Sequence, residues 1–256
     1  MKVGLAIGWL SFLALLTFAG AARPGGPWLG TLDGHQGVVR CMAFSPDGKT
    51  LAVGAGTVEP KGLTAFGEVT LWEVSTRQRR GILRSRMWLV PTLAFAPDGR
   101  TLVAAGYDGT ARLWDLGQQK ERCIFKTGGA DQRGLAFTPD GRTLATGGEK
   151  MADSVKLWEV DTGKERARLP EGSGIPLAFV AHGKLLTVSD STMQLWDVAL
   201  QQKRRAFAIK GWSFSIAVSP DGKLLATDSN GDIGAGSVWE TETGKLRFAI
   251  PPGGEC

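Results

Sequence analysis

The stretch SPDGKTLA, residues 45–52, returns along the chain in nearly identical form. It recurs as APDGRTLV from Ala96, as TPDGRTLA from Thr138 and as SPDGKLLA from Ser219, and a decayed copy, AHGKLL, begins at Ala181. The glycines shared by the five copies follow one another after 51, 42, 42 and 39 residues. Self-similarity at a nearly fixed period is typical of a repeat architecture. The repeat therefore determines the fold.

A second marker keeps the same period. Five tryptophans follow one another after 42, 44, 38 and 43 residues: Trp72, Trp114, Trp158, Trp196 and Trp239. In each unit a short apolar run such as CMAF (41–44) precedes the turn, small residues follow it, and a third run ends in the tryptophan. Because Pro and Gly favour a tight turn, we expect a hairpin at each Pro-Asp-Gly. The runs are too short and too rich in Gly for helices, so each unit predicts four antiparallel strands.

Four-stranded antiparallel units of about 40–45 residues are what a β-propeller requires. The chain resembles the WD-repeat family in its Leu-Trp-Asp segments at 113–115 and 195–197, its Trp-Glu variants at 72, 158 and 239, its Pro-Asp-Gly turns and its Gly34-His35 pair. The resemblance covers residues 28–250. It implies an all-β fold, a β-propeller of four-stranded antiparallel blades with five repeats visible and an incomplete sixth as a further option.

The WD-repeat family often joins a His, a Ser or Thr, an Asp and the Trp of each blade in one hydrogen-bonded set. Here only His35 stands at the Gly-His position, and Asp108 fits the turn before a third strand. The resemblance also implies a structural role for the five repeat tryptophans. Since most sets lack members, we expect apolar packing between neighbouring sheets to stabilise the blades.

Six outer-strand candidates accompany the five sets of inner strands, and the first of them is 28–32. In the WD-repeat family the first outer strand commonly completes the last blade. Two arrangements stay open: a closed ring of five blades, or a truncated propeller that another chain completes. An open ring exposes strand edges, and such edges pair readily with other chains.

The N-terminus indicates export. Lys2, the uncharged run 3–18 and the Ala19-Gly20-Ala21 site indicate a secretory signal over residues 1–21, followed by a Pro/Gly linker at 22–27. The alternative is an uncleaved membrane anchor over residues 3–22, which are long enough to span a bilayer. We expect a periplasmic or extracellular propeller at 28–250 with a C-terminal tail at 251–256. A membrane is a partner only if the N-terminal segment is retained.

Composition argues against catalysis and against nucleic-acid binding. The chain has 30 Lys+Arg against 25 Asp+Glu, only 2 His and 3 Cys. Cys41, Cys123 and Cys256 form no disulfide framework, and no His or Cys pair has metal-ligand spacing. The recurring acids at 47, 98, 140 and 221 are interpreted as turn residues. We predict no enzyme activity, no metal, no cofactor and no nucleic-acid partner.

The candidate binding residues lie in connections between blades. Arg86 and Trp88 precede the second unit, Lys210 and Trp212 the fifth, and Gln36 and Arg133 occupy similar connections. The insertion 57–67 would join them on one face. Exposed Trp and Arg are favoured anchors at protein interfaces. We therefore predict a scaffold for an unidentified protein or peptide.

Three alternatives to this prediction remain. The propeller could be a small-ligand sensor or an enzyme-associated domain, or a truncated propeller that another chain completes. A further question concerns the basic clusters at 77–86 and 203–205. They either coat the outer strands, where charge protects an exposed edge, or attract an anionic partner in a salt-dependent way.

Overall fold

The computed structural model describes residues 32, 34–58, 65–85, 89–129, 132–148, 154–189, 191–208, 216–219, 221–228 and 236–250. These residues form five four-stranded antiparallel sheets, here called blades 1 to 5, each with its strands in chain order. The predicted fold class is confirmed. The strand 28–32, apart from Leu32, the signal 1–21, the linker 22–27 and the tail 251–256 lie outside the described residues.

The strand bounds follow the repeat. Blade 1 contains β1 (Val38–Phe44), β2 (Thr50–Val58), β3 (Ala65–Glu73) and β4 (Arg79–Ser85). Blade 2 contains β5 (Thr92–Phe95), β6 (Thr101–Ala105), β7 (Thr110–Asp115) and β8 (Lys120–Lys126). Blade 3 contains β9 (Gln132–Phe137), β10 (Thr143–Gly148), β11 (Lys156–Glu159) and β12 (Glu165–Arg168). Blade 4 contains β13 (Ile175–Val180), β14 (Lys184–Ser189), β15 (Thr192–Asp197) and β16 (Gln202–Ala208). Blade 5 contains β17 (Ile216–Val218), β18 (Leu224–Asp228), β19 (Gly236–Glu240) and β20 (Leu246–Ile250).

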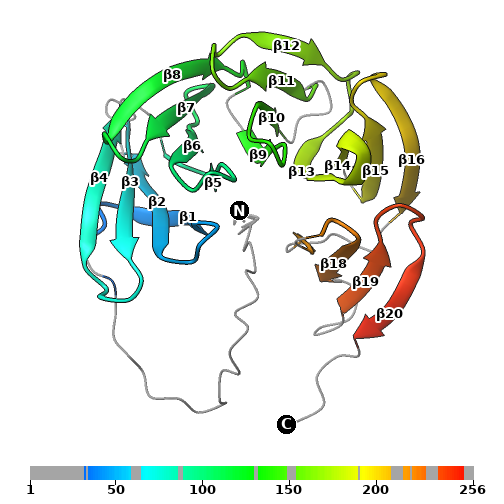
Figure 1. The fold of residues 1–256 in the computed structure, drawn as a ribbon, viewed down its shortest axis with the longest axis horizontal. Coiled ribbons are helices and arrows are strands. Elements are labelled where there is room, and N and C mark those ends of the chain that lie inside the picture. Colours follow the sequence, from blue (N-terminus) through cyan, green and yellow to red (C-terminus); the bar gives the residue numbers. More distant parts are fainter. Residues whose placement is uncertain are drawn as a thin grey trace, which may run out of the picture.

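The blades stand side by side in an arc (Figure 1). The inner strands β1, β5, β9 and β13 lie near the centre, and the outer strands β4, β8, β12, β16 and β20 form the rim. The described part of the arc is open between blade 1 and blade 5.

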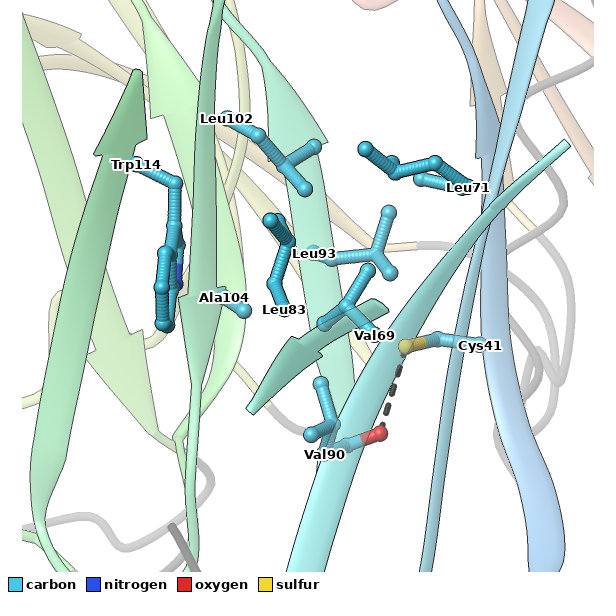
Figure 2. Packing of buried hydrophobic residues seen from close by; sticks show 10 residues of the cluster. Cys41, Val69, Leu71, Leu83, Val90, Leu93, Leu102, Ala104 and Trp114 are labelled. Carbon is cyan, nitrogen blue, oxygen red and sulfur yellow. Dashed lines mark hydrogen bonds between the residues drawn. The ribbon is translucent and has the colours of Figure 1, made fainter. Parts of the chain in front are cut away.

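Four apolar clusters join consecutive blades. In the cluster between blades 1 and 2, Cys41, Val69 and Leu71 face Leu93, Leu102 and Trp114 (Figure 2). In every such cluster one blade contributes its tryptophan side, here called the Trp face, and the preceding blade contributes the opposite side, here called the forward face. Within the described residues no cluster joins the forward face of blade 5 to the Trp face of blade 1.

The Pro-Asp-Gly turns form as predicted. Gly48 has a φ of 69°, the left-handed conformation that Gly adopts without steric cost. Asp47 accepts hydrogen bonds from the Ser45 hydroxyl at 2.6 Å and from the Lys49 amide at 3.0 Å. These two bonds hold the pKa of Asp47 below its usual value, and the same arrangement recurs at Asp140 and Asp221. These acids therefore stabilise turns, as interpreted from the sequence.

The hydrogen-bonded sets are incomplete, as expected. In blades 3, 4 and 5 the indole N–H of the tryptophan donates to a threonine hydroxyl two residues along the neighbouring strand; the pairs are Trp158 with Thr146, Trp196 with Thr187, and Trp239 with Thr227. Blades 1 and 2 carry Val53 and Ala104 at the equivalent position. The indole nitrogens of Trp72 and Trp114 are consequently buried without a hydrogen-bond partner.

This difference between blades yields a paired prediction. Thr146→Val should lower the free energy of unfolding by about 1–3 kcal/mol, because the Trp158 N–H loses its acceptor in a buried place. Val53→Thr, a change of nearly equal volume, should raise it by up to about 1 kcal/mol by giving Trp72 an acceptor. Urea unfolding followed by circular dichroism measures both variants. Equal destabilisation by the two substitutions would contradict the account.

Candidate functional site

The blade topology places the connections at two ends of the arc. Because the strands of each blade are antiparallel and consecutive, the Pro-Asp-Gly turns share one end with the short turns that lead to the outer strands. The connections between blades share the other end with those between second and third strands. We call the first end the turn face and the second the loop face. By this topology Gln36 and Arg133 adjoin connections at the loop face.

Two of the six predicted binding residues can be examined. Arg86, Trp88, Lys210 and Trp212 lie outside the described residues. Gln36 is exposed, and its backbone N–H donates to the Glu68 carboxylate at 2.9 Å. Arg133 lies on β9, whereas the sequence analysis placed it in a connection.

Glu68 holds the segment before β1 onto blade 1. Its side chain is 0% exposed, accepts the Gln36 N–H and lies 3.8 Å from the Arg84 guanidinium. Next to it, the His35 ring packs against Trp72 with ring centroids 5.5 Å apart. His35 therefore packs on the Trp face of blade 1. Glu68 was not predicted, although an acid within the run EVTLW, among apolar residues of a strand, was a signal.

Arg133 opens on a cavity of about 430 Å³ at the centre of the arc. The inner strands of all five blades line this cavity, with apolar residues such as Met42, Leu93 and Val218. Arg133 is the one charged residue in the lining formed by the described chain. A predominantly apolar cavity with a few polar groups is typical of small-molecule sites. In the small-ligand alternative, this cavity is where the ligand would bind.

A second, polar pocket of about 180 Å³ lies between blades 2 and 3 at the loop face. Its lining comes from the β8–β9 connection and from all four strands of blade 3 or their ends: Thr127, Gly128, Gln132, Thr146, Ser154, Lys156 and Arg168. None of these residues was predicted. The available signal was Lys156, a cation two residues before the repeat tryptophan, on the side of β11 that faces blade 2.

Two side chains determine the chemistry of this polar pocket. The Lys156 ammonium donates to the Thr127 carbonyl at 2.6 Å and lies 5.8 Å from the centroid of the Trp158 ring. Gln132 is only 3% exposed, and its side-chain amide nitrogen donates to the Gly129 carbonyl at 3.5 Å. The Gln132 side-chain oxygen is buried without a hydrogen-bond partner. The pocket thus offers the Lys156 ammonium and an unused acceptor, while the Arg168 guanidinium in its lining is paired with Glu165.

The two cysteines among the described residues lie within the packed blades. Cys41 and Cys123 are both free; burial raises the pKa of each thiol, and the Cys41 thiol donates to the Val90 carbonyl at 3.2 Å. Thiols with raised pKa values are poor nucleophiles. The described chain contains no group of three His, Cys, Asp or Glu side chains that could hold a metal ion.

Arginines of the basic clusters, on the outer strands β4 and β16, pair with acids at the ends of the neighbouring strands β3 and β15. Arg80 lies 3.5 Å from Glu73, and Arg204 lies 2.9 Å from Asp197, where its hydrogen bond lowers the pKa of that carboxyl. These contacts favour the structural explanation, in which the cations coat the rim of the arc. Such exposed ion pairs add little stability.

No helix within the described ranges has the length and apolar character needed to cross a membrane. The predicted anchor at residues 3–22 lies outside those ranges.

Comparisons with known proteins agree with the fold. The family model "WD domain, G-beta repeat" matches residues 26–57, 84–115 and 121–159. Periodic tryptophan protein 2 of Arabidopsis thaliana is 30% identical over 225 residues, which are 85% of this chain and 24% of that protein. Apoptotic protease-activating factor 1 of Homo sapiens is 36% identical over 84 residues, which are 29% of this chain and 6% of that protein. Centriole proteome protein 16 of Chlamydomonas reinhardtii is 31% identical over 103 residues, or 5% of its length.

The chain therefore spans about a quarter or less of the length of these relatives. WD-repeat proteins generally act as non-catalytic scaffolds that bind other proteins. The three matched segments, the five blades and their periodic tryptophans together identify this chain as a member of the WD-repeat β-propeller family.

Proposed function

We propose that this chain is a non-catalytic scaffold that binds a protein or peptide through its loop face. The observation that carries the proposal is the polar pocket at that face, where Lys156 and the unpartnered oxygen of Gln132 meet between two rigidly packed blades. Rigid blades support the face, because apolar clusters fix each blade against the next. WD-repeat proteins generally bind other proteins, which supports the same proposal.

The proposal is tested with the tryptophans selected from the sequence. Trp88→Ala and Trp212→Ala should each reduce capture of the partner from a cell-envelope extract at least tenfold, since aromatic anchors dominate interface energies. Lys223→Ala, on the turn face, is the matched control and should leave capture unchanged. Circular dichroism checks that all three variants fold. Unchanged capture by both tryptophan variants would reject the loop-face assignment.

We also propose that the chain acts after export. Lys2, the apolar run and the Ala19-Gly20-Ala21 site support this location. Sequencing the N-terminus of the protein from an envelope fraction tests it. A mature chain that starts at Ala22 is the expected result. An intact Met1 in the membrane fraction would favour the anchor.

A second candidate function is supported by the forward face of blade 5. Ala226 is exposed there, whereas its equivalents in the other blades, Ala52, Val103, Ala145 and Leu186, are all 0% exposed. Phe248, whose strand partner Val238 belongs to the same face, is 57% exposed. Each forward face elsewhere packs against the Trp face of the following blade. We propose a Trp-bearing blade of another chain as the occupant of this face.

A fusion tests this candidate. A further copy of residues 86–126, which contains blade 2, is attached after residue 250. Burial of Phe248 and its neighbours should raise the melting temperature of the single unfolding transition by about 5 °C or more. Introducing Ala226→Glu into the fusion should abolish the gain. A separate transition for the added segment, or the same gain with Ala226→Glu, would exclude the forward face as a docking surface.

A further inference from the structure

The polar pocket between blades 2 and 3 has a counterpart in blade 2 that shows what is missing from it. Arg112 lies two residues before Trp114, just as Lys156 lies two residues before Trp158. Arg112 is 3.1 Å from Glu121 and 3.6 Å from Asp108. In blade 2, therefore, the chain neutralises this cation with its own carboxylates.

The described residues of blade 3 do not repeat this neutralisation. Glu165 occupies the strand position of Glu121, because both pair with the repeat tryptophan. However, Glu165 forms its ion pair with Arg168 at 2.9 Å. Among the described residues no acid lies within ion-pair distance of Lys156. The ammonium donates instead to the backbone carbonyls of Thr127 at 2.6 Å and Lys126 at 3.5 Å, which leaves one of its three N–H groups for a ligand.

The Gln132 oxygen sets a second requirement. A buried acceptor without a partner costs roughly 1–3 kcal/mol, so a ligand that donates a hydrogen bond is favoured there. Thr146 accepts from the Trp158 indole, which leaves the Thr146 hydroxyl proton available as a donor. A phosphomonoester dianion, which only accepts, would leave Gln132 unsatisfied. A carboxylate accepts a hydrogen bond from Lys156, and an amide N–H next to it donates to the Gln132 oxygen. A group that has both therefore meets the two requirements.

We propose that this pocket binds a peptide carboxylate together with the adjacent amide N–H. The carboxylate contacts Lys156 and Thr146, and the N–H donates to Gln132. Two sources share this chemistry: the C-terminus of a partner chain and an internal aspartate. The volume of about 180 Å³ exceeds that of a single water, about 30 Å³, and accommodates one such group. The inference rests on the proposed scaffold function and names the group that the loop face recognises.

The indole N–H of Trp158 gives a local readout, because its acceptor Thr146 lines the pocket. The full chain is labelled with ¹⁵N-tryptophan and titrated with the peptide acetyl-Gly-Gly-Ala, either with a free C-terminus or amidated. A third arm uses amidated acetyl-Gly-Asp-Gly. The Trp158 signal should shift with the free acid or with the aspartate peptide, whichever source applies. The amidated acetyl-Gly-Gly-Ala should give no shift.

Variants separate recognition from folding. Lys156→Met, which keeps the length of the side chain, should weaken binding at least tenfold, and Lys156→Arg should restore most of it. Lys120→Met, which removes an exposed charge on β8, is the matched control and should change affinity less than twofold. Melting curves confirm that each variant is folded.

Three outcomes would overturn the inference: equal binding of the free and amidated peptides, wild-type affinity in Lys156→Met, or displacement of the peptide by an equal concentration of inorganic phosphate. Absence of a shift with every peptide would do the same. These failures are distinguishable from failure of the scaffold proposal. Partner capture that depends on Trp88 and Trp212 can persist when the pocket binds no carboxylate.

Discussion

Replacing Gly174 by Ala should lower the free energy of unfolding by about 3 kcal/mol or more, because strain and overlap act together. Gly174 has a φ of 79°, which side chains other than hydrogen rarely adopt. An added Cβ would overlap the Val188 carbonyl oxygen and lie 2.9 Å from the Ser189 Cβ. The backbone of β14 must then move away from the start of β13.

Gly172 is the matched control for Gly174. It lies two residues earlier with a similar φ of 76°, but an added Cβ would meet no atom within 4 Å. Gly172→Ala should therefore show the backbone strain alone, about 1–2 kcal/mol. Guanidinium unfolding of both variants measures the difference. Equal losses would mean that the contact with β14 is looser than the structure indicates.

Phe125→Ala should lower the free energy of unfolding by about 3–5 kcal/mol. Phe125 is 0% exposed, belongs to the cluster between blades 2 and 3, and lies 5.4 Å from Trp158 between ring centroids. Its removal leaves a cavity that the two packed sheets cannot fill without separating. Because β8 precedes the connection that bears Thr127, the variant should also weaken peptide binding.

Phe248→Ala is the control for Phe125. The side chain is 57% exposed on the forward face of blade 5, so its loss from the isolated chain should change stability by less than about 0.5 kcal/mol. Thermal unfolding at low protein concentration compares the two variants. A loss of 2 kcal/mol or more for Phe248→Ala would show that blade 5 packs against another surface in solution.

Much of the fold could be predicted because the turn and the tryptophan are local signals with one period. The Pro-Asp-Gly turns at 46–48 and 97–99 determine where strands end, and the alternation around Trp114 determines which residues are buried. Closure could not be predicted, because it depends on how the curvature of successive blades adds up, which no local motif encodes.

The candidate site was harder to predict for a related reason. Lys156 and Gln132 are separated by 24 residues and meet only when two strands of blade 3 pack beside the β8–β9 connection. A single lysine in a strand is usually solvated, so its pattern carries little information. Arg133 was expected in a connection, but β9 begins one residue earlier and directs the chain toward the central cavity. A strand boundary that differs by one residue is finer than a sequence pattern can locate.

The loop-face account is tested most directly by crosslinking the captured partner through lysines. Lys126 ends β8 and Lys156 begins β11, so both lie near the loop face, whereas Lys49 and Lys223 belong to Pro-Asp-Gly turns at the turn face. Mass spectrometry of the crosslinked complex identifies which lysines are joined. The account predicts partner crosslinks at Lys126 and Lys156 that disappear with Trp88→Ala or Trp212→Ala. Crosslinks confined to Lys49 and Lys223 would contradict it.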